Sequence, residues 1–178
     1  MIGATGVRPG EATSTTMALF LKNLLFTVFV PGTVAVYLPL TIAAGRPAAT
    51  GAAFALAAIV FAVGAAIYLW CLWDFATFGR GTPAPIDPPS KLVVRGLYRY
   101  VRNPMYVGVL TMILGWALCF LARDLAVYGL VVAAGFHVFV VLYEEPALRR
   151  RFGPEYDEYQ ARVGRWLPRL RRAEGASR

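Results

Sequence analysis

The chain has 178 residues, of which 58% are hydrophobic and only 16% are charged. Because ordinary soluble domains are about 25% charged, this composition excludes an ordinary soluble domain. The net charge of +8 comes from 18 lysines and arginines against 10 acidic residues. Two cysteines and a single histidine give neither a disulfide framework nor a metal cluster, so we expect no metal.

Long apolar runs account for the composition. Residues 1–16, rich in Gly, Ser and Thr, are expected to form a disordered tail. Each run that follows has about the 18 residues that a helix needs to cross ~30 Å of hydrocarbon. The four runs are residues 24–43, 52–73, 105–122 and 125–143. We therefore predict an all-α integral membrane protein with about four transmembrane helices, in a single domain at 17–170 followed by a basic tail at 171–178.

The first run contains Pro31 and Pro39, and either a cleaved signal peptide or a retained helix is conceivable. The run is longer than the usual apolar core of a signal peptide, which favours a retained helix. Neighbouring helices can satisfy the backbone groups that proline frees within a membrane.

Basic residues are unevenly distributed among the loops. If all four runs cross, 16 of the 18 lysines and arginines lie on one side, and only Arg46 and Arg123 lie on the other. The positive-inside rule then predicts a multi-pass protein of the inner or plasma membrane with both termini in the cytoplasm. Retention of the basic tail and its attraction to anionic lipid explain the charge without a nucleic-acid partner.

The segments between and after the runs have their own signals. Four prolines exclude a helix across 79–90. Asn103-Pro104 is typical of an N-cap followed by proline at the first helical position. After the fourth run, Pro154 suits another helix start, and apolar residues at helical spacing predict a C-terminal amphipathic surface helix near 154–163.

Two clusters of chemically capable residues flank the third and fourth runs. Tyr98, Arg102, Asn103 and Tyr106 precede or begin the third, whereas Glu144-Glu145 follows the fourth, with His137 two turns deeper. Because these runs form a tight hairpin, the two clusters are expected to meet. Paired carboxylates at a membrane helix end are costly without a cationic partner. They could bind a ligand cation or pair with Arg149 or Arg150, and His137 could line a pocket or be a core residue.

The pattern Arg95-Gly96-x-Tyr98-x-x-x-Arg102-Asn103-Pro104-x-Tyr106-x-Gly108, followed by Glu144-Glu145-x-x-Leu148-x-x-x-Phe152-Gly153-x-x-Tyr156-x-x-Tyr159, resembles the isoprenylcysteine carboxyl methyltransferase family. The phospholipid methyltransferases are related to that family. The resemblance covers roughly residues 91–168. It implies a membrane enzyme that uses S-adenosylmethionine as its cofactor.

Carried over to this chain, the resemblance assigns cofactor binding to Lys91, Leu92, Val93, Tyr98, Asn103, Pro104, Met105, Tyr106, Gly108 and Glu144. Arg102 or the start of the third helix would suit the carboxylate of the cofactor. We further predict that Asn103, Tyr106 and Glu145 lie at the reaction and that His137 and Val140 lie beside the acceptor. Two positions differ from the family pattern. Asn103 replaces a histidine, and Val140 replaces an arginine that holds the carboxylate of prenylcysteine.

We therefore expect an S-adenosylmethionine-dependent methyltransferase that acts on a lipidic or hydrophobic substrate at the cytoplasmic membrane face. The acceptor is a membrane lipid or a hydrophobic small molecule, and a lipid amine, a lipidic acid and an unrelated molecule all remain open. No required protein partner is evident. The alternatives are a non-catalytic membrane scaffold and a small transporter, which would need charged or broken helices at mid-membrane. Phe152, Tyr156 and Tyr159 are further predicted to close over the cofactor as a lid.

Overall fold

The computed structural model describes residue 21 and residues 24–79 and 91–169, which form an all-helical protein. The predicted tails at 1–16 and 171–178 and most of the proline-rich segment lie outside the described residues. In the described part a single isolated bridge, between Val101 and Gly164, stands in for strand pairing. The α-helices are α2 (Leu38–Ile42), α3 (Gly51–Asp74), α4 (Pro104–Phe120), α5 (Arg123–Phe139), α6 (Glu145–Phe152) and α7 (Pro154–Arg162), and the shorter η1 (Thr33–Tyr37), η2 (Phe75–Gly79), η3 (Gly96–Arg99) and η4 (Val140–Glu144) connect them.

The helices are those of a membrane protein. Among the described residues, Leu24–Ile42, Gly51–Phe78 and Arg123–Phe152 are each long and apolar enough to cross a bilayer, whereas α4 is apolar but shorter. Their outer faces expose large apolar side chains that only lipid would cover, including Phe54 and Ile59 of α3 and Leu130 of α5. The fold class predicted from the apolar runs is confirmed.

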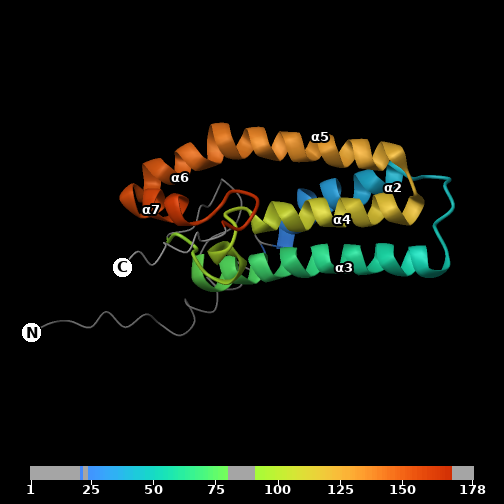
Figure 1. Ribbon diagram of the computed structural model, residues 1–178, viewed down its shortest axis with the longest axis horizontal. Helices are drawn as coiled ribbons and strands as arrows, with labels where there is room; N and C mark the ends of the chain where they lie inside the picture. Colours follow the sequence, from blue (N-terminus) through green and yellow to red (C-terminus); the bar gives the residue numbers. More distant parts are fainter. Residues whose placement is uncertain (1–20, 22–23, 80–90, 170–178) are drawn as a thin grey trace, which may run out of the picture.

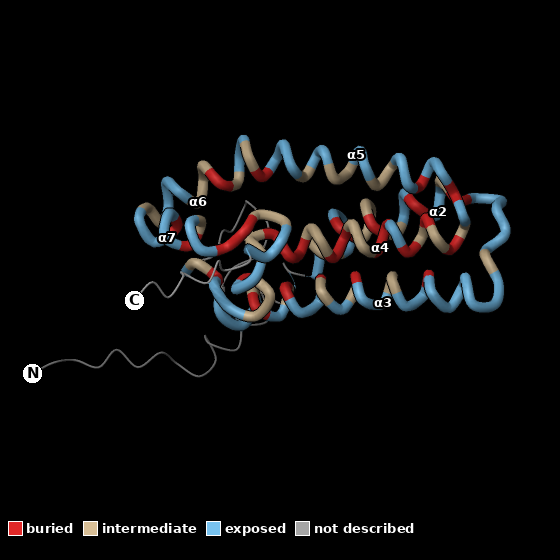
Figure 2. Tube along the Cα trace, in the orientation of Figure 1, coloured by how far each residue is buried: buried red, intermediate tan, exposed pale blue. Residues whose placement is uncertain are grey.

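Helix α4 is the centre of the molecule. Figure 1 shows α3 and α5 on opposite sides of it, with α2 nearby. Buried positions follow α4 along its length, whereas α3 and α5 are exposed over much of their outer surfaces (Figure 2). The core cluster contains Ile113 and Met112 of α4, Cys71 of α3 and Ala35 of η1.

Close packing of α3 on α4 depends on glycine. A Cβ atom added to Gly108 would lie 2.9 Å from the backbone oxygen of Gly64 and 2.9 Å from the backbone nitrogen of Tyr68. One added to Gly115 would lie 2.8 Å from the Cβ of Phe61. Small residues let membrane helices approach closely, and that approach replaces the hydrophobic driving force that lipid does not provide.

The hairpin between α4 and α5 is as tight as predicted. Helix α4 ends at Phe120 and α5 begins at Arg123. Leu121 closes α4 in the left-handed conformation, with φ of 47°, and its NH donates to the carbonyl of Leu118. At this end of the molecule the guanidinium of Arg46 pairs with the carboxylate of Asp124.

The helix of the fourth run continues beyond its predicted end at 143. Residues 123–152 form one helical stretch, in which the π-helical η4 joins α5 to α6 with a bend (Figure 1). Pro146 is the second residue of α6, and Pro39 likewise is the second residue of α2, directly after π-helical η1. A wide π-helical turn beside the proline tolerates the missing hydrogen bond, because proline has no backbone NH to donate. Glu144 and Glu145 therefore lie inside a continuous helical stretch, not at the end of a helix.

Candidate functional site

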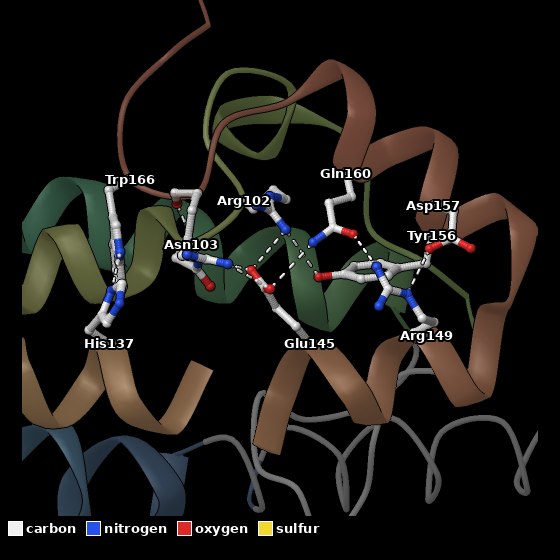
Figure 3. A network of polar contacts seen from close by, with 10 residues as sticks. Arg102, Asn103, His137, Glu145, Arg149, Tyr156, Asp157, Gln160 and Trp166 are labelled. Carbon is white, nitrogen blue, oxygen red and sulfur yellow. Dashed lines mark hydrogen bonds and ion pairs between the residues drawn. The ribbon is translucent and has the colours of Figure 1, made fainter. Parts of the chain in front are cut away.

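The two predicted clusters do meet, and a third segment joins them. Residues at the start of α4, on η4 and α6, and on α7 with the chain that follows it lie together at one end of the molecule (Figure 3). Arg102 contacts Glu145, and Tyr106 contacts Glu144. The meeting of the clusters is thus confirmed. The contribution of residues 160–166 was not predicted.

Glu145 is the centre of a polar clamp formed with Arg102, Gln160 and Arg165. Figure 3 shows Glu145 between Arg102 and Gln160. Its Oε1 accepts hydrogen bonds from Nη1 of Arg102 at 2.8 Å and from Nε of Arg165 at 2.7 Å. Its Oε2 accepts from Nη2 of Arg165 at 2.9 Å and from Nε2 of Gln160 at 3.3 Å. Glu145 is 9% exposed and both its oxygens are used, so a direct catalytic role would require one of these partners to leave.

Glu144 has a different environment. Its Oε2 accepts a hydrogen bond of 2.8 Å from the hydroxyl of Tyr106, and in the described part of the chain this is the only hydrogen bond of the carboxylate. The ring of Tyr106 packs on Phe136 with centroids 4.6 Å apart, and Trp166 lies 6.4 Å from Tyr106. A carboxylate beside aromatic rings is a typical environment for an organic cation.

The chain after α7 passes across the start of α4. The NH of Arg102 donates to the carbonyl of Gly164 at 2.8 Å, and Nδ2 of Asn103 donates to the carbonyl of Arg165 at 3.1 Å. Asn103 occupies the predicted N-cap position, followed by Pro104, but its side chain makes no capping hydrogen bond. Its amide group instead binds the C-terminal segment, and no local sequence pattern predicts this hydrogen bond.

Three tyrosines are buried beneath this segment. The hydroxyl of Tyr159 donates to the carbonyl of Tyr98 at 2.8 Å, and Tyr156 is only 2% exposed. Burial raises the pKa of Tyr98, Tyr156 and Tyr159, so all three remain protonated at neutral pH. The apolar side of α7 therefore packs on the chain itself, in a cluster with Val163. The lid role of Tyr156 and Tyr159 stays a prediction.

Most of the other residues that the resemblance assigns to the cofactor pack in the protein interior. Val93, Tyr98 and Met105 belong to the core, Leu92 packs against the α7 cluster, and Gly108 makes its close approach to α3. Pro104 is buried and Lys91 is exposed. The assigned residues whose polar side chains make hydrogen bonds at this end of the molecule are Arg102, Asn103, Tyr106 and Glu144.

An apolar groove of about 450 Å³ lies between α4 and α5. Only one of the two predicted acceptor residues lies at this groove. His137 lines it, whereas Val140 is buried and 1% exposed. Trp166 also lines the groove and donates from Nε1 to Nδ1 of His137 at 3.1 Å (Figure 3). Further lining residues are Leu110, Thr111, Leu114 and Ala133.

Asp74 is a buried acid that the sequence did not single out. It lies at the end of α3, is 1% exposed, and pairs through Oδ1 with Nε of Arg95 at 3.2 Å. A Cβ on Gly96 would overlap its Oδ2, so glycine is required at that turn. The sequence signal for Asp74 was an acidic residue at the end of an apolar run. Its partner Arg95 could not be recognised because it lies far along the chain.

Comparison with known proteins identifies relatives of this chain. A model of the phospholipid methyltransferase family matches residues 52–155, more than half of the chain. Methanethiol S-methyltransferase of Pseudomonas deceptionensis is 37% identical over 83 residues, which are 45% of this chain and 29% of that protein. The probable protein-S-isoprenylcysteine O-methyltransferase of Oryza sativa subsp. indica is 36% identical over 82 residues, 46% of this chain and 43% of that protein. Protein-S-isoprenylcysteine O-methyltransferase B of Arabidopsis thaliana is 35% identical over 78 residues, 44% of this chain and 40% of that protein.

Proposed function

The chain belongs to the phospholipid methyltransferase family, and from this premise we propose that it transfers a methyl group from S-adenosylmethionine to an apolar acceptor at one face of a membrane. The predicted resemblance to this group of methyltransferases is confirmed. The chain spans less than half the length of the curated relatives described above, so its activity and acceptor are proposals.

The observation that carries the proposal is the placement of two opposite charges around an aromatic cluster. S-adenosylmethionine supplies a methyl group on a positively charged sulfur and also carries an ammonium and a carboxylate. Glu144 would pair with the ammonium. Arg102, whose Nε is buried and has no hydrogen-bond partner within the described ranges, would donate to the carboxylate. Tyr106 would offer its ring face to a cation.

The polar clamp gives Arg102 its orientation. Because Glu145 occupies only Nη1 of Arg102, the position of the guanidinium is fixed while its buried Nε keeps no partner within the described residues. Partnership with Glu145 also raises the pKa of Arg165, so that the clamp stays charged. Catalysis would then consist mostly of holding donor and acceptor in line.

The groove between α4 and α5 is the proposed acceptor site. Its lining is almost entirely apolar, and it opens between two helices whose outer surfaces are apolar. An acceptor that partitions into lipid would reach it sideways from the bilayer. The names of the relatives refer to methanethiol and to isoprenylcysteine, in both of which a hydrocarbon group is attached to sulfur. We place the polar end of the site, with both termini, on the cytoplasmic side because the basic residues gather there.

Calorimetric titration with S-adenosylmethionine and S-adenosylhomocysteine tests the proposal. The wild-type protein should bind both, and Glu144→Gln should weaken binding of S-adenosylmethionine more than tenfold, since a charge-assisted hydrogen bond contributes about 1.5–3 kcal/mol. Glu155→Gln, which removes an equal charge from an exposed position on α7, should leave affinity unchanged.

Thermal melting should be alike for wild type and both variants. Absence of binding to the wild-type protein would reject the methyltransferase and favour the scaffold. Unchanged affinity in Glu144→Gln would instead place the ammonium elsewhere.

A further inference from the structure

The hydrogen bond between Trp166 and His137 fixes which imidazole nitrogen carries the proton. An indole NH can only donate, so Nδ1 of His137, 3.1 Å away, must accept and therefore has no hydrogen. A neutral imidazole then carries its proton on Nε2. His137 thus presents a hydrogen-bond donor on the side of the ring away from Trp166.

His137 lines the apolar groove, so this donor belongs to a residue of its wall. The two other polar side chains that line the groove have already used their hydrogens: Thr111 donates to the carbonyl of Val107 at 2.8 Å, and Trp166 donates to His137. Within the described residues, the Nε2–H of His137 is consequently the polar hydrogen left for an acceptor. His137 also lies on the same helical stretch as Glu144, two turns away.

We propose that Trp166 and His137 select the atom that receives the methyl group, favouring an ionised sulfur or oxygen over an amine nitrogen. This inference rests on the proposed methyl transfer. A thiolate sulfur or a carboxylate oxygen has several lone pairs, so one can accept from Nε2–H while another attacks. An amine nitrogen has one lone pair, which the same hydrogen bond would occupy. A protonated amine would bring its own hydrogens against Nε2–H.

The transfer balances without a base. The acceptor sulfur or oxygen forms its new bond to the methyl carbon with its own lone pair. The bond from that carbon to the sulfonium sulfur of the donor breaks, and its electron pair stays on that sulfur. Because the acceptor arrives ionised, no proton leaves in this step. His137 is the residue that determines specificity, and Trp166 is a positioning residue that acts through it.

Nitrogen-15 NMR tests the tautomer directly, because His137 is the only histidine in the chain. The protein, labelled at histidine and purified without a polyhistidine tag, is placed in nanodiscs of neutral lipid. We expect a protonated Nε2 and an unprotonated Nδ1 in the wild type, and a mixture of both tautomers in Trp166→Phe. Trp73→Phe, an exposed position on α3, should match the wild type. A protonated Nδ1 in the wild type would overturn the inference.

Acceptors of equal chain length test the selection. An alkanethiol, an alkanoate and an alkylamine are compared for their shift of the Nε2 resonance and for transfer of a labelled methyl group. The thiol and the acid should shift the resonance and react with kcat/KM more than about tenfold above that of the amine, a difference of about 1.4 kcal/mol. His137→Phe should reduce this preference for the thiol and the acid over the amine while the affinity for S-adenosylmethionine stays unchanged, and Trp166→Phe should reduce the preference as well.

The two proposals can fail separately. An amine methylated as well as the thiol and the acid overturns the selection but keeps the methyltransferase. Shifts confined to the thiol and the acid, without transfer to any acceptor, keep the selection and reject the methyltransferase. If the amine shifts the resonance as strongly as the others do, the selection is wrong whatever the activity.

Discussion

The two faces of α4 are packed in opposite ways. Toward α3, Gly64, Gly108 and Gly115 let backbones touch, and little space remains between the helices. Toward α5, larger side chains such as Leu110 and Leu114 stand apart and leave a groove, while contact is made at the hairpin end and through the polar clamp. One face of a single helix therefore provides the permanent scaffold, and the other leaves room for a molecule to enter.

Removing the carboxylate of the clamp should give the largest effect. Glu145→Ala leaves Arg102 charged, buried and without its main partner, which should lower the free energy of unfolding by about 3–5 kcal/mol. Thermal melting in detergent measures the change. Glu158→Ala breaks only the exposed pair with Arg162, so its melting should be close to that of the wild type. Equal melting temperatures of the two variants would show that contacts other than the clamp hold α5 and α6 against α4.

Adding one carbon to the close face should come next. In Gly108→Ala the new Cβ meets backbone atoms of α3, and overpacking of this kind costs about 1–3 kcal/mol. Gly135→Ala on α5 is the matched control, because a Cβ there meets nothing within 4 Å. That control should be neutral or slightly stabilising, since alanine suits a helix interior better than glycine. Similar melting of both variants would contradict the distinction between the two faces.

Filling the groove should affect turnover but leave the fold intact. Leu114→Trp places a large ring at the groove, and we expect kcat/KM for an apolar acceptor to fall about tenfold or more, equivalent to about 1.4 kcal/mol. Melting temperature and affinity for S-adenosylmethionine should stay as they are. Leu130→Trp, on the exposed surface of α5 outside the groove lining, should leave kcat/KM unchanged. If both variants have wild-type turnover, the acceptor binds elsewhere.

The smallest effect is expected at the hairpin end. Arg46→Ala removes an ion pair with Asp124 whose side chains are 39% and 51% exposed, and exposed pairs contribute about 0.2–1 kcal/mol. The loss of stability in Arg46→Ala should be smaller when melting is repeated at high salt, because ions screen exposed charges. A loss that salt does not change would mean that the pair lies in a less polar environment than its exposure indicates.

The helices were predictable because the signal for each is local. Apolar runs placed α3 and α4 to within a few residues, and Asn103-Pro104 marked the start of α4. The end of the fourth run was misplaced for the same reason. Glu144, Glu145 and Pro146 together resemble a helix end when their partners are unknown. Those partners, together with a π-helical turn, keep the chain helical.

The site was predictable only in part. Adjacent runs forced the start of α4 toward η4 and α6, so the pairing of Tyr106 with Glu144 could be anticipated from topology. Arg165 and Trp166 could not be found in this way. They lie beyond the last predicted helix, and no pattern says that the chain turns back over α4 after Val163. Backbone hydrogen bonds such as that from Arg102 to Gly164 decide that path.

The polar clamp also has a consequence for biosynthesis. Arg165 lies 20 residues after Glu145 and is synthesised later, by about 1–4 s at ordinary rates of translation. Until then the carboxylate has only Arg102 and Gln160 available and lacks the two hydrogen bonds from Arg165. The helices can thus enter the bilayer while the clamp is half assembled, and the end of α5 should become rigid only once Arg165 has reached Glu145. A released chain truncated before Arg165 would accordingly be more accessible to protease around α6 than one truncated after Pro168.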